Sequence, residues 1–416
     1  MTGGGNKHWL RTFRRVHPPR DKAHIVATRS YLSYEAQELQ DKLDRNPYSY
    51  LHVINPEAAQ EKGLQAGTPA YFAEVRQAYE AFRKRNWLVD SEGMGLAVYR
   101  QTTEESIFTG IIAVMELEGL RHGRLKLHES TLEERESLFA EYLATVGCHA
   151  EPILAARPTG HAGEAQVDSM VDAITFLAPD LDFTTTDRVR HTVWWVNETQ
   201  AAALAQELSR TECLYLADGH HRAASSLRLA DAHPDEPAKQ GLLTMILPER
   251  DLLIRGFHRL VRPMGMTLPA LLDRLKAAPA IAQVDQIAGP DAYFVEPPAA
   301  LGVVHLVHRT GVWAVTFADN NIEITDADRL GDHVLGPIFG ITQPRTDKRL
   351  SYVAGPDGLA DLHRQVLRGD DDRCGWAMHP VGTDQLKAIS DAGGTFPPKS
   401  TWIEPKLRSG LFVYEL

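Results

Sequence analysis

Residues 214–227 read Leu-Tyr-Leu-Ala-Asp-Gly-His-His-Arg-Ala-Ala-Ser-Ser-Leu, and the local fold follows from them. The run before Asp218 is apolar and rich in strand formers, whereas the residues after Arg222 are small and suit a helix. Gly219 supplies the conformational freedom that a sharp turn needs. The stretch therefore predicts a strand, a turn and a helix that extends to about residue 230.

The predicted turn is dense in polar groups, which are Asp218, His220, His221 and Arg222. Backbone N–H groups in the first turn of a helix have no intrahelical partner and attract anions. Arg222 at that place suits a pair of phosphate oxygens. The alternative is a buried polar turn in which Asp218 caps the helix. Four polar groups at the exit of an apolar strand favour a functional site.

The composition bounds the class of protein. A chain of 416 residues is long enough for two or three domains. Its 44 basic and 55 acidic side chains leave a net charge of −11, so we expect neither a nucleic acid nor a membrane as partner. Three scattered cysteines indicate a reducing compartment, and no apolar run is long enough to span a bilayer. We therefore expect a cytoplasmic protein.

Strand and helix patterns alternate along the chain. We expect strands over 25–31, 50–56, 96–100, 108–115, 152–156, 192–196, 242–247, 301–307 and 312–317. We expect helices over 34–43, 69–87, 132–143 and 201–208, and an irregular excursion over 157–187. The basic residues 1–24 suit either an arm that reaches a phosphate or a solvated leader, and their charge favours the leader. The alternation indicates an α/β or α+β fold with mixed sheets.

The pair His128-Glu129 stands where a predicted strand gives way to a helix. A carboxylate at such a place projects into a shared cleft and suits a general base. Equally, Glu129 suits the first turn of a helix, where the helix dipole favours an acid. The residues alone leave these two interpretations open.

Two later stretches are also dense in polar groups. Residues 344–349 include Arg345 and Lys348, which suit a clamp for phosphate or carboxylate oxygens, although a solvated loop is more common. Residues 397–402 place Lys399, Ser400 and Thr401 behind a double proline, which suits recognition of a small polar ligand. The alternative there is a structural turn before a terminal strand over 411–414.

The sequence has no Walker phosphate loop and no dinucleotide fingerprint, so the turn at 218–222 must bind any phosphate by another scaffold.

Three of these motifs together resemble a known family. Residues 215–222 resemble the Asp-Gly-His-His-Arg signature of the ParB/sulfiredoxin-like free serine kinases, in which a His-Glu pair precedes the signature and a Pro-Lys-hydroxyl-Thr segment follows it. Here the pair is His128-Glu129 and the segment is 398–401, in the same order. Over nearly its whole length the chain also resembles a large bacterial and archaeal family of unknown function, at 46–52, 345–349 and 397–402.

The resemblance to the kinases implies a role for each matching residue. Glu129 matches the carboxylate that takes the proton from the serine hydroxyl, and Asp218 matches the acid beside the phosphates and Mg²⁺. Gly219, His220, His221 and Arg222 match the groups that hold the transferred phosphate. Lys399, Ser400 and Thr401 match the segment that recognises the amino acid, although Trp402 stands where the kinases have a basic residue. His128, Arg345 and Lys348 are further candidates for the site.

The resemblance also implies a division of the chain and a function. Residues 93–265 would form a ParB/sulfiredoxin-like core, with α/β extensions over 1–92 and 266–416. The implied function is a Mg²⁺-dependent kinase that converts free L-serine to O-phospho-L-serine with ATP or ADP. The alternatives are a nucleotide-hydrolysing DNA-binding switch of the ParB type, which the acidic balance disfavours, and a non-catalytic nucleotide or phosphate sensor. Glu129 separates the kinase from the sensor, because a sensor needs no base.

Overall fold

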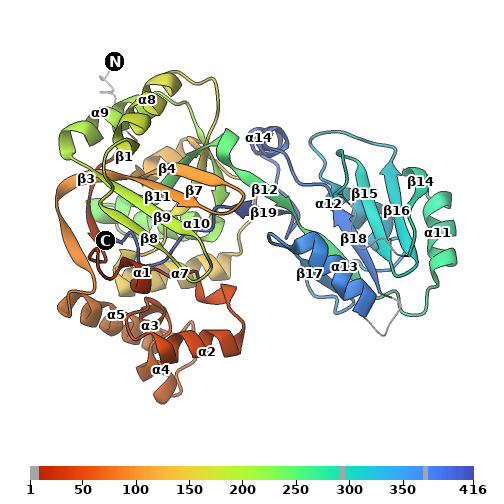
Figure 1. Ribbon diagram of the computed structural model, residues 1–416, viewed down its shortest axis with the longest axis horizontal. Helices are drawn as coiled ribbons and strands as arrows, with labels where there is room; N and C mark the ends of the chain where they lie inside the picture. The colour runs from red at the N-terminus through yellow and green to blue at the C-terminus, as the bar shows by residue number, and fades with distance from the viewer. Residues whose placement is uncertain (1–8, 291–295, 369–372) are drawn as a thin grey trace. The chain divides into compact units, whose positions relative to one another are not determined.

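The computed structural model describes residues 9–290, 296–368 and 373–416. Contacts along the chain define two compact units, shown in Figure 1. The first contains the described residues up to Leu252 together with Pro405–Leu416, and the second is Leu253–Glu404. The chain thus leaves the first unit and returns to it for its last residues. The functional division into 1–92, 93–265 and 266–416 stays a prediction.

The first unit is built on a ten-stranded mixed sheet with the order β5-β10-β7-β11-β4-β3-β9-β8, in which β1 pairs with β4 and β2 with β3. Its strands are β1 (Leu10–Arg11), β2 (Phe13–His17), β3 (Val89–Thr102), β4 (Ile107–Glu116), β5 (Leu125–Lys126), β7 (Ile153–Arg157), β8 (Leu181–Thr184), β9 (Arg190–Val196), β10 (Leu214–Asp218) and β11 (Gly241–Pro248). The pairs β5–β10 and β7–β11 are parallel, and the other pairs are antiparallel. This confirms the predicted mixed α/β class.

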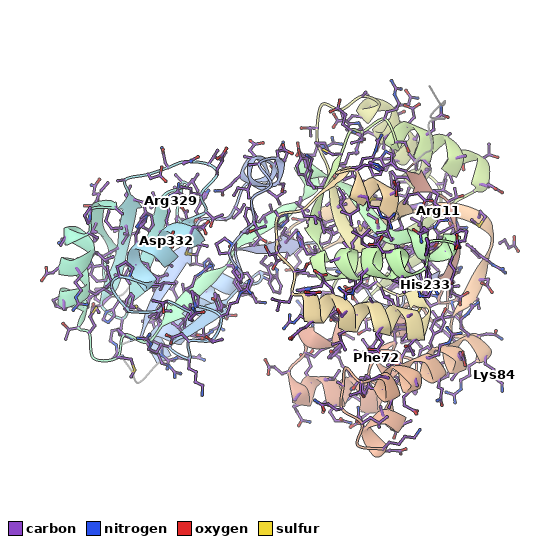
Figure 2. All side chains as sticks on the ribbon, turned by 180° about the vertical axis from the view of Figure 1, so that it is seen from behind. Arg11, Phe72, Lys84, His233, Arg329 and Asp332 are labelled. Carbon is purple, nitrogen blue, oxygen red and sulfur yellow. The ribbon has the colours of Figure 1, made fainter. Side chains whose placement is uncertain are left out.

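Helices pack against this sheet. They are α1 (Ala23–Val26), α2 (Ala36–Arg45), α3 (Leu51–Ile54), α4 (Glu57–Glu61), α5 (Pro69–Lys84), α6 (Leu117–Arg121), α7 (Glu133–Val146), α8 (Glu164–Thr175), α9 (Glu198–Leu208) and α10 (His220–Ala232). Figure 1 shows α8 and α9 at one end of the unit and α2 to α5 at the other. Phe72 of α5 lies against α7, where its ring meets Tyr142 edge-on at 5.3 Å (Figure 2). The predicted helices over 34–43, 69–87, 132–143 and 201–208 are confirmed.

Two predicted strands are wrong. The segment 25–31 begins with the last two residues of α1, and 50–56 contains the short helix α3, while Thr28 makes only an isolated bridge to Ser409. Their β-formers Val26 and Val53 are completely buried in a cluster with the aromatic face of α5. Packing against a helix therefore overrode the local preference for a strand.

The basic segment near the N-terminus also differs from expectation. Arg11 lies in β1, and Arg15 in β2 is 4% exposed with its guanidinium donating to the carbonyls of Leu96 and Val196. A solvated leader is thus wrong for residues 10–17, whereas residues 1–8 lie outside the described part. The predicted excursion over 157–187 likewise contains α8 and β8.

The second unit has a six-stranded antiparallel sheet, with the order β14-β16-β15-β18-β13-β17, and a separate β12–β19 pair. Its strands are β12 (Leu253–Gly256), β13 (His258–Val261), β14 (Ile281–Ala288), β15 (Val303–His308), β16 (Gly311–Phe317), β17 (Leu350–Val353), β18 (Cys374–Met378) and β19 (Thr401–Glu404). Its helices are α11 (Leu268–Ala277), α12 (Asp326–Leu330), α13 (Gly358–Arg368) and α14 (Thr383–Asp391). Two hydrophobic clusters, one with α11 and α12 and one with α13, contain alternate residues of the sheet, as in Leu306 and Val307.

The end of the chain returns to the first unit. There β20 (Tyr414–Glu415) pairs with β6 (Cys148–His149), so the predicted terminal strand over 411–414 begins later than expected. The carbonyl of Ser409 accepts from the N–H of Thr28, and Gly410 donates to the carbonyl of Ala150. These bonds fix residues 405–416 to the first unit.

Candidate functional site

The site begins with the turn between β10 and α10. Gly219 has a φ of +102°, and a Cβ added there would lie 2.7 Å from Cγ2 of Ile153. Only glycine fits this place. The N–H of Ala223 bonds to the carbonyl of Gly219 at 2.9 Å and starts the helical ladder. The N–H groups of residues 220–222 therefore belong to the helix N-terminus, where anions are favoured.

The parallel pairing of β5 with β10 brings His128-Glu129 to this turn. Lys126 stands beside Tyr215 in the register, so the two chains leave the sheet in the same direction. As a result, Oε2 of Glu129 lies 3.5 Å from Nδ1 of His220, and the ring of His128 meets that of His220 edge-on at 4.4 Å. The side chain of Glu129 is 47% exposed, while that of His220 is 5% exposed. The pair thus joins an accessible carboxylate to a buried imidazole.

Burial keeps the two central imidazoles neutral. It lowers the pKa of His220 to about 4, against an opposing effect of Asp218, and it holds the pKa of His128 well below its ordinary value, with His220 adding to the effect. Within the described residues Nε2 of His220 has no hydrogen-bond partner. A neutral His220 is suited to orient Glu129 through Nδ1.

Asp218 and Arg222 form a second part of the site. The Nη2 group of Arg222 donates to Oδ2 of Asp218 at 3.0 Å, and its Nη1 group donates to the carbonyl of Pro152 at 2.7 Å and to Oε1 of Glu151 at 2.5 Å. Glu151 accepts in turn from the hydroxyl of Ser409 at 2.7 Å. The guanidinium is therefore held between two carboxylates.

Lys406, near the C-terminus, brings a second positive charge to Asp218. Nζ of Lys406 lies 3.6 Å from Oδ1 of Asp218. Burial raises the pKa of Asp218, but Lys406, Arg222 and His220 outweigh it and hold that pKa below its ordinary value. Asp218 is therefore a carboxylate at neutral pH.

The charged groups that act on His221 differ from those that act on Asp218. The pKa of His221 is lowered by burial and by Arg135, while Glu136 opposes the shift. Both of these neighbours belong to α7. The side chains of His220, His221 and Arg222 therefore have three different surroundings.

The other predicted site residues belong to the second unit. Lys399 is exposed with a φ of +61°, and its Nζ lies 5.5 Å from the centre of the Phe257 ring. Ser400 is buried and donates to the carbonyl of Pro397 at 2.7 Å, and Thr401 begins β19. Arg345 and Lys348 are exposed. Their part in the site stays a prediction.

Sequence reasoning did not include Glu151, Lys406 or Ser409 in the site. Glu151 precedes the predicted strand over 152–156, and Lys406 stands between Glu404 and Arg408 in an alternating charge pattern. Only the alternation of charges around Lys406 could have indicated it, and such alternation is common on exposed strands.

Across residues 9–290, 296–368 and 373–416, no cluster of three or more His, Cys, Asp or Glu suits a metal ion. In the same part of the chain, no helix combines the length and the apolar character that crossing a membrane requires.

Comparison with known proteins gives one family and several distant structures. A family model described as "Protein of unknown function (DUF1015)" matches residues 10–336. No curated protein gives a significant match. A free serine kinase in complex with AMP has 14% identity and a TM-score of 0.36, covering 72% of this chain and 91% of that one.

Two further structures are similar at the same level. A conserved hypothetical protein from Pyrococcus furiosus has 15% identity and a TM-score of 0.35, with 72% of this chain and 95% of that one covered. SbnI from Staphylococcus aureus, with a C-terminal truncation, has 11% identity and a TM-score of 0.34, covering 70% of this chain and 82% of that one.

Proposed function

We propose that this chain, which belongs to the DUF1015 family, is a phosphotransferase that moves a phosphoryl group from a nucleotide to the hydroxyl of a small acceptor, free L-serine. The observation that carries the proposal is the 3.5 Å separation of Glu129 and His220 at the N-terminus of α10. It puts an accessible carboxylate beside a place where backbone N–H groups favour phosphate. The assignment to serine rests on the sequence motifs that resemble free serine kinases.

In the proposed reaction Glu129 takes the proton of the acceptor hydroxyl. The hydroxyl oxygen forms a bond to the terminal phosphorus, and the bond from that phosphorus to its bridging oxygen breaks. The bridging oxygen keeps the electron pair and leaves with the nucleotide. His220 holds the carboxylate of Glu129 in place, and the N–H groups of the first turn of α10 bind the phosphoryl oxygens.

The carboxylate of Asp218 is a suitable ligand for a Mg²⁺ ion. Mg²⁺ binds through one or two carboxylates together with phosphate oxygens and water. Asp218 is an ionised carboxylate at the same turn and would hold the ion, which would supply charge neutralisation for the phosphates. The proposal also includes a ParB/sulfiredoxin-like core over 93–265 and roles for Lys399, Ser400 and Thr401 in holding the amino acid.

The test is an assay of purified protein with L-serine, Mg²⁺ and either ATP or ADP, read by mass spectrometry. Formation of phosphoserine that depends on L-serine supports the proposal. Nucleotide hydrolysis at the same rate with and without L-serine would instead indicate a nucleotide-hydrolysing switch. Binding of nucleotide without turnover, across a panel of free amino acids and sugars as acceptors, would indicate a sensor and contradict the proposal.

A further inference from the structure

Two cations, Arg222 and Lys406, stand beside Asp218, and the role of Lys406 is the less obvious of the two. Arg222 is engaged by two carboxylates, Asp218 and Glu151, and by the carbonyl of Pro152. The site as a whole sets three carboxylates, those of Glu129, Glu151 and Asp218, against two cations. Without Lys406 a phosphate at the helix N-terminus would face three carboxylates against the single cation of Arg222, and Lys406 reduces that excess of negative charge to one.

Lys406 differs from Arg222 in how it is held. Its ammonium stands 3.6 Å from Oδ1 of Asp218, and 37% of its side chain is exposed. Lysine carries a compact charge on a flexible stem with rotatable donors, so its ammonium can exchange one oxygen partner for another. Asp218 directly precedes Gly219, the cap of α10, so the ammonium of Lys406 stands at the turn where the phosphates would bind.

The backbone of Lys406 is fixed within the first unit. Its carbonyl accepts from the side-chain amide of Gln101 on β3 at 3.2 Å. Two residues later, Arg408 is 4% exposed and donates to Asp187 at 2.7 Å, and Ser409 donates to Glu151 at 2.7 Å. A fixed backbone with a movable ammonium is the arrangement that a phosphate-contacting lysine requires.

We propose that Lys406 is a phosphate-contacting catalytic residue, which turns from Asp218 to the phosphates of a bound nucleoside phosphate, while Arg222 is an internal clamp between Asp218 and Glu151. This inference rests on the proposed function, because it takes the turn at Gly219 as the nucleotide site. It adds a residue that lies outside the span of the family model, residues 10–336.

The test compares binding of ADP and of adenosine by isothermal titration calorimetry, without Mg²⁺, at low and high salt. For Lys406→Met we expect the Kd for ADP to rise about 10- to 100-fold, with a weaker dependence on salt, because one charge-assisted hydrogen bond is lost. The Kd for adenosine stays unchanged. Lys406→Arg keeps most of the affinity for ADP, and the urea midpoint of Lys406→Met stays at the wild-type value.

The matched control is Lys62→Met, which removes another partly exposed lysine of the first unit, 2.6 Å from Glu74, and leaves ADP binding unchanged. Amine labelling gives a second readout on the wild-type protein: ADP protects Lys406 from acetic anhydride and adenosine does not. Equal ADP affinity in Lys406→Met, or no protection of Lys406, overturns the inference and leaves the phosphotransferase intact if phosphoserine still forms. A wild-type protein that neither binds ADP nor forms phosphoserine overturns both.

Discussion

Nδ1 of His220 lies 3.5 Å from Oε2 of Glu129, and the two residues follow parallel neighbouring strands, β10 and β5. The imidazole is buried and the carboxylate is accessible. A neutral imidazole beside the carboxylate leaves the negative charge of Glu129 unpaired with a cation from His220. This relationship makes Glu129 the first residue to test.

Glu129→Gln should lower turnover about 10²-fold or more, because the amide cannot accept the proton of the acceptor hydroxyl. Binding of ADP should stay within a few-fold of the wild type. The control is Glu133→Gln, which changes an 84% exposed acid at the start of α7 and should leave the rate unchanged. Turnover in Glu129→Gln equal to that of the control would remove Glu129 from the mechanism.

Gly219→Ala should destabilise the protein by more than a positive φ alone can explain. The left-handed conformation costs an alanine about 1–2 kcal/mol, and the new Cβ would also meet Ile153 at 2.7 Å. Gly123→Ala is the matched control, since Gly123 has a φ of +70° with no heavy atom within 4 Å of the added Cβ.

Urea unfolding of both variants measures the difference. We expect Gly219→Ala to lose about 1–3 kcal/mol more than Gly123→Ala, from overpacking against β7. Equal losses of stability in the two variants would show that the turn at Gly219 accommodates a Cβ, and that its close approach to β7 does not contribute to stability.

His191 should make stability depend on pH. It is completely buried, with Nδ1 2.7 Å from the hydroxyl of Tyr99 and Nε2 3.1 Å from that of Thr185. Burial, with Arg408, lowers its pKa to about 3, whereas the unfolded chain has about 6.5. Because the folded pKa is the lower one, the unfolded state binds the extra proton, and stability falls as the pH drops from about 6.5 towards about 3.

The measurement is the free energy of unfolding in urea at about pH 7.5 and about pH 5. His191 accounts for about 2 kcal/mol of the loss between them. His191→Gln should reduce the loss by that amount, and His122→Gln, which replaces a 67% exposed histidine, should not change it. A pH dependence identical in the wild type and His191→Gln would show that folding does not lower the pKa of His191.

Local pattern was enough for much of the fold. The helices at 34–43, 69–87 and 132–143 were predictable because apolar residues recur at helical spacing and because Asn46-Pro47 ends the first of them. The segments 25–31 and 50–56 were not, since their β-formers are buried among helices. A strand preference of this size is smaller than the free energy gained by burying an apolar side chain.

The sequence by itself determined the strand, turn and helix around Gly219, because a glycine turn between an apolar run and a helical run is a local property. It also pointed to His128-Glu129, since both residues sit at the end of a predicted strand. Only the tertiary structure decided that Glu151 binds Arg222, that Ser409 donates to Glu151 and that Lys406 reaches Asp218. Glu151 is 71 residues from Arg222 along the chain, and Ser409 is 258 residues from Glu151. Contacts across such distances depend on strand pairing and on the return of the chain to the first unit, which local pattern does not encode.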